Sequence, residues 1–165
     1  MPTETEVRVM KILTAIEITP AAAEKIKTMG SEAVTVVAEA ALGTYPGLRL
    51  KVRTNAVGLL GWVDHPQAAE TLALLVNDPN PDVAIRAIRA TGRRRDEGVV
   101  SKLAQILTNP SSTPILAAEA VKALRAIGSA AAMAALSTYE ASSPQQTAHR
   151  GSAVVRDVLA RRRTP

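Results

Sequence analysis

The sequence predicts an all-α fold: a right-handed α-solenoid of about four to five antiparallel helical hairpins. Three observations predict it. Apolar residues recur at helical spacing along the chain, and no stretch alternates as a half-buried strand does. Prolines and glycines interrupt this pattern where helices are expected to begin and end. Three stretches of the chain also align with one another without gaps.

The helices are predicted from those interruptions. A capping side chain followed by proline marks a helix start, because proline at the first helical position loses no hydrogen bond. Such pairs are Thr19-Pro20, Asn80-Pro81, Thr113-Pro114 and Ser143-Pro144, with Asp64-His65-Pro66 as a looser version. Glycines expected at helix ends are Gly30, Gly43, Gly61, Gly92 and Gly128. The predicted helices lie near 4–17, 20–29, 31–42, 48–62, 66–76, 81–94, 97–108, 114–127, 130–141 and 144–162.

One of these helices has an ambiguous sequence. The stretch "EAVTVVAEA" is rich in β-branched residues, which favour strands. Ser31 as an N-terminal cap and the surrounding Ala, Glu and Leu favour a helix over 31–42.

The aligned stretches are "VRTNAVGLLG" (52–61), "VAIRAIRATG" (83–92) and "EAVKALRAIG" (119–128). A repeat of this period, with one helical hairpin per unit, is the signature of a solenoid whose stacked hairpins share one core. We therefore expect the aligned apolar positions to be buried between hairpins. These positions are Ala56, Val57, Ala87, Ile88, Ala123 and Leu124.

The stretch "LLVNDPNPDVAIRAIRATG" resembles the HEAT-like repeats found in phycobilin lyases, which pair an apolar helix with an Asp-Pro turn and a Val-rich helix. The family's Val-Arg pair is kept as Val52-Arg53, whereas Ala84 and Ala120 replace the arginine in the next two repeats. The resemblance implies that Arg53 bonds an inter-helix loop. It covers 31–128 well and 129–163 loosely. From the chain length of 165 residues we expect one domain over 1–165, with capping helices over 1–30, the best-formed repeats over 31–128, and a capping repeat with a basic tail over 129–165.

Basic residues concentrate on the second helices of the repeats. On a helical wheel Arg86, Arg89 and Arg93 fall within an arc of about 60°, and Lys122 and Arg125 of the next repeat fall in the same arc. The corresponding region of the first repeat holds Lys51, Asn55 and Trp62. In HEAT-like solenoids the second helices line the concave surface, so we expect these eight residues to form a partner-binding surface. The alternative is an ordinary solvated helix face.

Trp62 and the arginines also have structural interpretations. Trp62 could instead close a turn by packing on Pro66, since large aromatic residues are usually mostly buried. Arg86 and Arg89 could pair with Asp82 or Asp96. Arg94, Arg95 and Lys102 are expected to be plain surface residues.

The sequence offers no catalytic constellation. Cys is absent and the histidines are His65, expected to cap a helix, and His149. The lack of Cys excludes thiolate sites, and the sequence contains no HExxH, no GxSxG and no phosphate-binding glycine loop. We expect no cofactor, no metal and no enzyme activity.

The lack of a leader or a long apolar run predicts a cytoplasmic protein without a membrane span. The abundance of Ala and of Arg over Lys is typical of a GC-rich bacterial genome.

Three functions stay open at this point. The leading hypothesis is a scaffold whose basic groove binds an acidic protein partner. The second is a nucleic-acid binder that works through phosphate contacts; aromatic residues make up only 2% of the chain, which disfavours single strands because base stacking needs them. The third, implied by the resemblance, is a subunit of a phycobilin-lyase-like complex.

Overall fold

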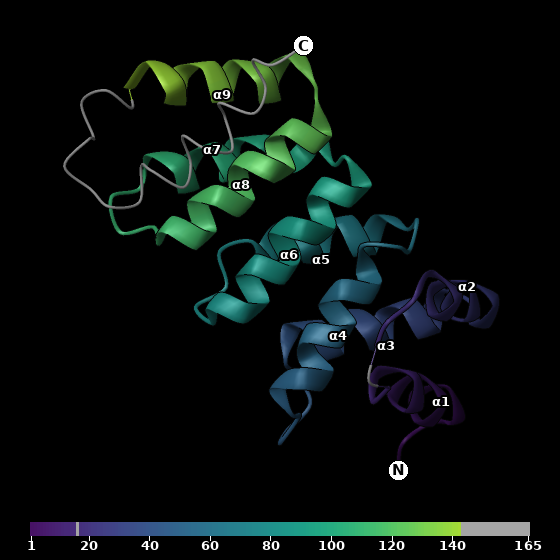
Figure 1. Ribbon diagram of the computed structural model, residues 1–165. Helices are drawn as coiled ribbons and strands as arrows, with labels where there is room; N and C mark the ends of the chain where they lie inside the picture. The colour runs from purple at the N-terminus through teal and green to yellow at the C-terminus, as the bar shows by residue number, and fades with distance from the viewer. Residues whose placement is uncertain (16, 143–165) are drawn as a thin grey trace. The chain divides into compact units, whose positions relative to one another are not determined.

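A computed structural model describes residues 1–15 and 17–142, and this part of the chain consists of helices and loops without strands (Figure 1). The all-α helical repeat fold is thus confirmed. The elements are α1 (Glu4–Leu13), α2 (Pro20–Met29), α3 (Ser31–Leu42), α4 (Leu50–Leu60), α5 (Pro66–Leu75), α6 (Pro81–Arg94), the 3₁₀ helix η1 (Glu97–Val99), α7 (Val100–Thr108), α8 (Pro114–Ile127) and α9 (Ala130–Ser142). The expected helix over 144–162, with its start at Ser143-Pro144, lies outside the described residues.

The chain forms two compact units, 1–90 and 91–165, and the division falls inside α6. The prediction of one domain over 1–165 stays a prediction. In the first unit α3 is central, because α1, α2, α4 and α5 all pack against it. Its sequence explains this position. Alanines and valines from Ala33 to Ala41 are buried around most of the helix, and such small side chains let neighbouring helices approach closely.

The second unit contains the end of α6, η1 and α7–α9. Each of α7, α8 and α9 packs against the other two. Leu103, Leu124 and Leu136, one from each of these helices, are at most 1% exposed. The residues expected to be buried by the repeat alignment are confirmed in both units. Ala56, Val57, Ala87, Ile88, Ala123 and Leu124 are all at most 3% exposed.

Several predicted helix boundaries hold. Asn80 accepts hydrogen bonds from the backbone N–H groups of Asp82 and Val83, and Thr113 accepts one from Leu116. His65 caps α5 by accepting from the Gln67 N–H at 3.2 Å, which confirms its expected role. Gly43 and Gly128 end their helices in the left-handed conformation, with φ of 79° and 68°.

Two of the predicted caps are wrong. Thr19 precedes α2 but makes no side-chain capping bond. Ser31 is the first residue of α3 rather than its cap, and that position is held by Gly30, which has no side chain to donate or accept. In α2 proline occupies the first turn and so reduces the number of N–H groups that need a partner.

One predicted helix end and the role of one glycine are also wrong, whereas the predicted bounds 81–94 of α6 are confirmed. The first helix ends at Leu13 instead of 17, and Thr14 caps it, with its backbone N–H and its hydroxyl both donating to carbonyls of the last turn. Gly92 lies inside α6 rather than at its end. The helix ends after Arg94, and Arg95 takes the positive φ of 55°. Gly92 is needed for space instead: a Cβ there would lie 2.9 Å from Ala123 Cα in α8.

Candidate functional site

A hollow of about 360 Å³ lies between α4 and the part of α6 that belongs to the first unit. We call it the α4–α6 hollow. It is lined by Leu50, Lys51 and Thr54 of α4 and by Asp82, Ile85, Arg86 and Arg89 of α6. The structure therefore brings together three of the residues predicted from the sequence, Lys51, Arg86 and Arg89, and all three are exposed.

Helix geometry places these side chains on the hollow. Asp82, Ile85, Arg86 and Arg89 follow the spacing i, i+3, i+4, i+7, which keeps residues on one face of a helix. At the start of α4, Thr54 lies four residues after Leu50 and three after Lys51, so it shares a helix face with both. Farther along α4, Gly58 leaves room for a side chain from α6: a Cβ at Gly58 would lie 3.5 Å from Arg86 Cδ. The aliphatic stem of Arg86 thus rests on the surface of α4.

The hollow also contains an apolar contact point that the sequence analysis missed. Leu50 is 43% exposed, and Ile85 beside it is half-buried. Asp82 adds a carboxylate to the basic lining. The helix predicted over 48–62 includes Leu50, but the helical wheel was used to compare basic residues. Counting back along α4 from Thr54 would have found it, since Leu50 lies four residues earlier.

The remaining predicted cations belong to the second unit. Arg93 is exposed and Arg125 is half-buried. Lys122 is exposed, and its Nζ lies 3.0 Å from Glu119 Oε1. The Glu119 side chain is only 8% exposed, so Lys122 neutralises a nearly buried carboxylate on its own helix. Part of the Lys122 charge is therefore already engaged within the fold.

Asn55 is not a surface residue, and its assignment to the partner-binding surface was wrong. It is 3% exposed, and its Nδ2 donates to the carbonyl oxygens of Leu13 at 2.8 Å and Ala15 at 2.9 Å. These carbonyls belong to the end of α1 and the residues after it, where backbone acceptors have no helical partner. Asn55 therefore attaches the N-terminal helix to α4.

Trp62 follows α4 and is 39% exposed. Its backbone N–H donates to the Leu59 carbonyl at 2.9 Å, which continues the last turn of the helix. An indole with this exposure presents a face to solvent. It does not line the α4–α6 hollow.

Arg53 performs the role that the family resemblance implies. Its Nε donates to the Ala41 carbonyl at 2.9 Å, near the end of α3, and its guanidinium pairs with Asp78 in the loop between α5 and α6. The two side chains are 20% and 7% exposed. One planar guanidinium thus joins consecutive hairpins, and its charge is used inside the fold.

The described residues contain no group of three or more His, Cys, Asp or Glu side chains arranged to hold a metal ion. His149 lies outside the described residues. No described helix combines the length and the apolar character that crossing a membrane requires. The absence of enzyme activity and the cytoplasmic location stay predictions.

Comparison with known families identifies the repeat. A family model of HEAT repeats matches residues 49–124 and 70–154, which together cover more than half of the chain. The chain belongs to the HEAT-repeat family. The matched region includes α4–α9 and therefore the α4–α6 hollow. A search of curated proteins finds no match.

The family model describes HEAT repeats in general, so the narrower likeness to phycobilin-lyase repeats stays a prediction. HEAT repeats are in general scaffolds for protein interactions.

Proposed function

We propose that this HEAT-repeat protein is a non-catalytic interaction module, and that its α4–α6 hollow binds an acidic segment of a protein partner. The observation that carries the proposal is the meeting of Lys51, Arg86 and Arg89 around one hollow. Two arginines suit carboxylates well, because each planar guanidinium can donate two parallel hydrogen bonds to one carboxylate.

The exposed Leu50 favours a protein segment over a purely ionic ligand. Ion pairs at the rim of an interface mainly govern the association rate and the choice of partner, whereas affinity depends on a few desolvated contacts. Leu50 and Ile85 supply apolar surface beside the cations. The expected segment therefore carries an apolar side chain next to two or more carboxylates.

Nucleic acid is the competing class of partner. Phosphates would engage the same cations, but the apolar surface of Leu50 adds little to phosphate binding. The two classes differ in their response to salt. Binding through phosphates weakens by about 0.9 log units per log unit of salt for each neutralised phosphate, and it depends little on base sequence.

The test is affinity capture from the source organism with three forms of the full chain as bait. These are the wild type, the hollow variant Arg86→Glu/Arg89→Glu, and the control Arg95→Glu/Lys27→Glu. Both variants change the net charge equally, and the control residues are exposed outside the hollow. We expect mass spectrometry to identify a protein that the wild type and the control retain and the hollow variant loses. Cross-linking should place an acidic segment of that protein beside α6.

Two results would contradict the proposal. The same proteins could be retained by all three baits, in which case the cations are only a solvated face. Alternatively, the wild type could bind duplex DNA of any sequence with the steep salt dependence given above, in which case nucleic acid is the partner.

A further inference from the structure

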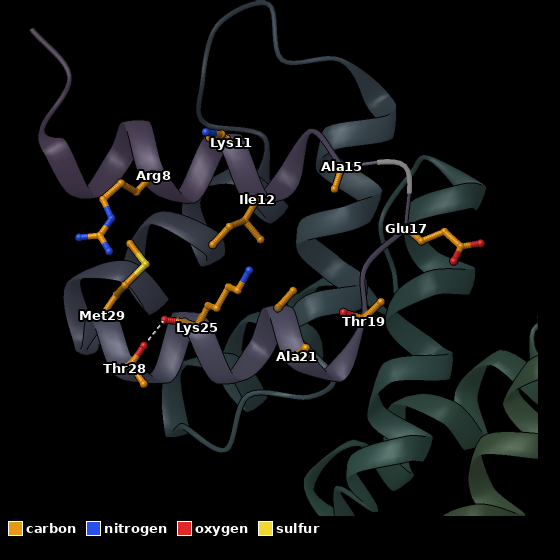
Figure 2. Close-up of a pocket in the computed structure, with 11 residues that line it drawn as sticks. Arg8, Lys11, Ile12, Ala15, Glu17, Thr19, Ala21, Lys25, Thr28 and Met29 are labelled. Atoms are coloured by element: carbon orange, nitrogen blue, oxygen red, sulfur yellow. Dashed lines mark hydrogen bonds between the residues drawn. The ribbon is translucent and has the colours of Figure 1, made fainter.

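A larger hollow, of about 590 Å³, lies between α1 and α2 at the other end of the first unit's sequence. We call it the α1–α2 groove. Figure 2 shows that the two helices run antiparallel and that their side chains enter the groove from both sides. The groove lies outside the matched HEAT repeats, and none of its lining residues belongs to the α4–α6 hollow.

The floor of the groove is apolar and combines three alanines with two larger side chains. It is formed by Ile12, Ala15, Ala21, Ala22 and Met29. These residues are not the ones that hold the two helices on the rest of the unit. That contact uses Val9 and Leu13 of α1 and Ala23 and Ile26 of α2, which are at most 1% exposed. Both helices therefore carry a second apolar face, and it remains partly open to solvent.

The rims of the groove are basic. Arg8 and Lys11 of α1 and Lys25 of α2 line it, and Lys11 and Lys25 are exposed on opposite sides (Figure 2). Arg8 pairs with Glu4 only at the limiting distance of 4.0 Å, with both side chains largely exposed. Such exposed pairs contribute little and reorganise easily. Glu17 lies at the loop end, and its carboxylate points away from the other labelled side chains.

From this geometry we infer that the α1–α2 groove binds an acidic amphipathic helix of a partner protein, as a second interaction surface beyond the proposed function. The alanines of the floor let a third helix approach two antiparallel helices closely. Its apolar stripe would cover Ile12 and Met29, and carboxylates on either side of that stripe would meet Lys11 and Lys25. This is the helix-in-groove mode of recognition. The groove runs along helices of 10 residues, about 15 Å, so about three turns of the ligand would be seated.

The experiment selects ligands from a display library of random peptides long enough for about four helical turns, about 15 residues. The full-length wild-type protein is the target. Peptides that also bind the variant Ala22→Phe are removed, because the phenyl ring would occupy the floor of the groove without changing the charge. We expect the enriched peptides to combine apolar residues at spacings of three and four with flanking Asp and Glu.

The contacts are then tested with two variants on the same helix. Lys25 lines the groove, whereas Lys27, two residues later, is exposed elsewhere and pairs with Glu24. We expect Lys25→Glu to weaken binding of an enriched peptide by at least about tenfold, through lost attraction and new repulsion, and Lys27→Glu to change it by less than about twofold. Lys27→Glu also breaks the pair with Glu24, but exposed pairs contribute little, so both variants should unfold close to the wild-type temperature. This keeps the test valid if Ala22→Phe disturbs the fold.

Three results would overturn the inference. The selection could yield no peptides that distinguish the wild type from Ala22→Phe. The enriched peptides could lack acidic residues or the helical apolar spacing. Lys25→Glu and Lys27→Glu could weaken peptide binding equally. If Lys25→Glu removes binding to anionic lipid vesicles or duplex DNA while no acidic peptide is enriched, the groove recognises that other ligand. Peptides that are lost only from Arg86→Glu/Arg89→Glu would report on the α4–α6 hollow instead.

Discussion

Individual side chains decide which cations of this protein are available to a partner. Arg53 and Lys122 both lie on second helices of repeats, yet both compensate carboxylates that are less than a tenth exposed. Arg86 instead rests its stem on α4 at Gly58 and reaches the α4–α6 hollow. A count of basic residues cannot separate these roles. The distinction comes from the partner that each guanidinium or ammonium group meets within the fold.

The buried pair of Arg53 and Asp78 leads to a stability prediction. Replacing Arg53 by Ala leaves Asp78 as a nearly buried carboxylate without its main partner, which should lower the free energy of unfolding by about 3 kcal/mol. Arg8→Ala removes an exposed pair and should change it by less than about 0.5 kcal/mol. Urea unfolding of the two variants measures both values. Equal effects would mean that Arg53 does not join the hairpins as described.

The tyrosine hydroxyls give a prediction for alkaline pH. Burial raises the pKa of Tyr45 above its usual 10.0, and the nearby Glu39 and Glu6 carboxylates raise it further. Burial also raises the pKa of Tyr139. Because the folded state favours the neutral phenols, this stabilisation is fully present below pH 10.0 and is lost as the pH rises through the higher folded pKa values.

The measurement is the ultraviolet absorbance of tyrosinate during an alkaline titration. The folded protein should ionise at higher pH than the same protein unfolded in urea, and Tyr45→Phe should leave only the transition of Tyr139. If the folded and unfolded proteins ionise together, the Tyr45 hydroxyl does not lie between Glu6 and Glu39.

At the level of helices, the sequence predicts where helices begin better than where they end. It also predicts which residues the repeats bury better than which residues remain on the surface. Asn80, Thr113 and His65 act as caps because their polar atoms reach backbone N–H groups within three residues, which is a local interaction. Gly92 was misjudged because its role depends on a contact with α8, far along the chain. Local patterns do not contain that information.

The misplacement of Asn55 has a similar cause. On a helical wheel it falls in the same arc as Arg86 and Lys122, and the repeat alignment treats those positions as equivalent. In the first unit, however, α1 and α2 pack against α4. They belong to residues 1–30, which carry no recognisable repeat. The residues that cover Asn55 therefore could not be predicted from the repeats alone.

The two helical glycines should respond oppositely to alanine. A Cβ at Gly92 would lie 2.9 Å from Ala123 Cα, so Gly92→Ala should force backbone movement and cost about 1–3 kcal/mol. A Cβ at Gly58 meets only the flexible Arg86 side chain, with Cδ nearest at an ordinary 3.5 Å, and alanine is the better helix former. Gly58→Ala should therefore be neutral or stabilising by up to about 1 kcal/mol. Thermal unfolding of both variants tests this, and destabilisation of the same size in both would contradict it.

At the level of the whole molecule, HEAT repeats provide an all-α scaffold, and such a fold does not by itself determine function. The family and the buried repeat positions were predictable from the sequence because the repeat pattern is regular. The α4–α6 hollow was predictable in part, through Lys51, Arg86 and Arg89. The α1–α2 groove was not, since it depends on how α1 and α2 pack, whereas Leu50 shares a helix face with Thr54 and was overlooked.

The most direct test of the central claim is the dissociation constant of the captured partner's acidic segment for the wild type, for Arg86→Glu/Arg89→Glu, and for the control Arg95→Glu/Lys27→Glu. We expect reversal of Arg86 and Arg89 to raise this constant by at least about tenfold, and the control to raise it by less than about twofold. An unchanged dissociation constant for the Arg86→Glu/Arg89→Glu variant would contradict the account and show that the α4–α6 hollow is not where the partner binds.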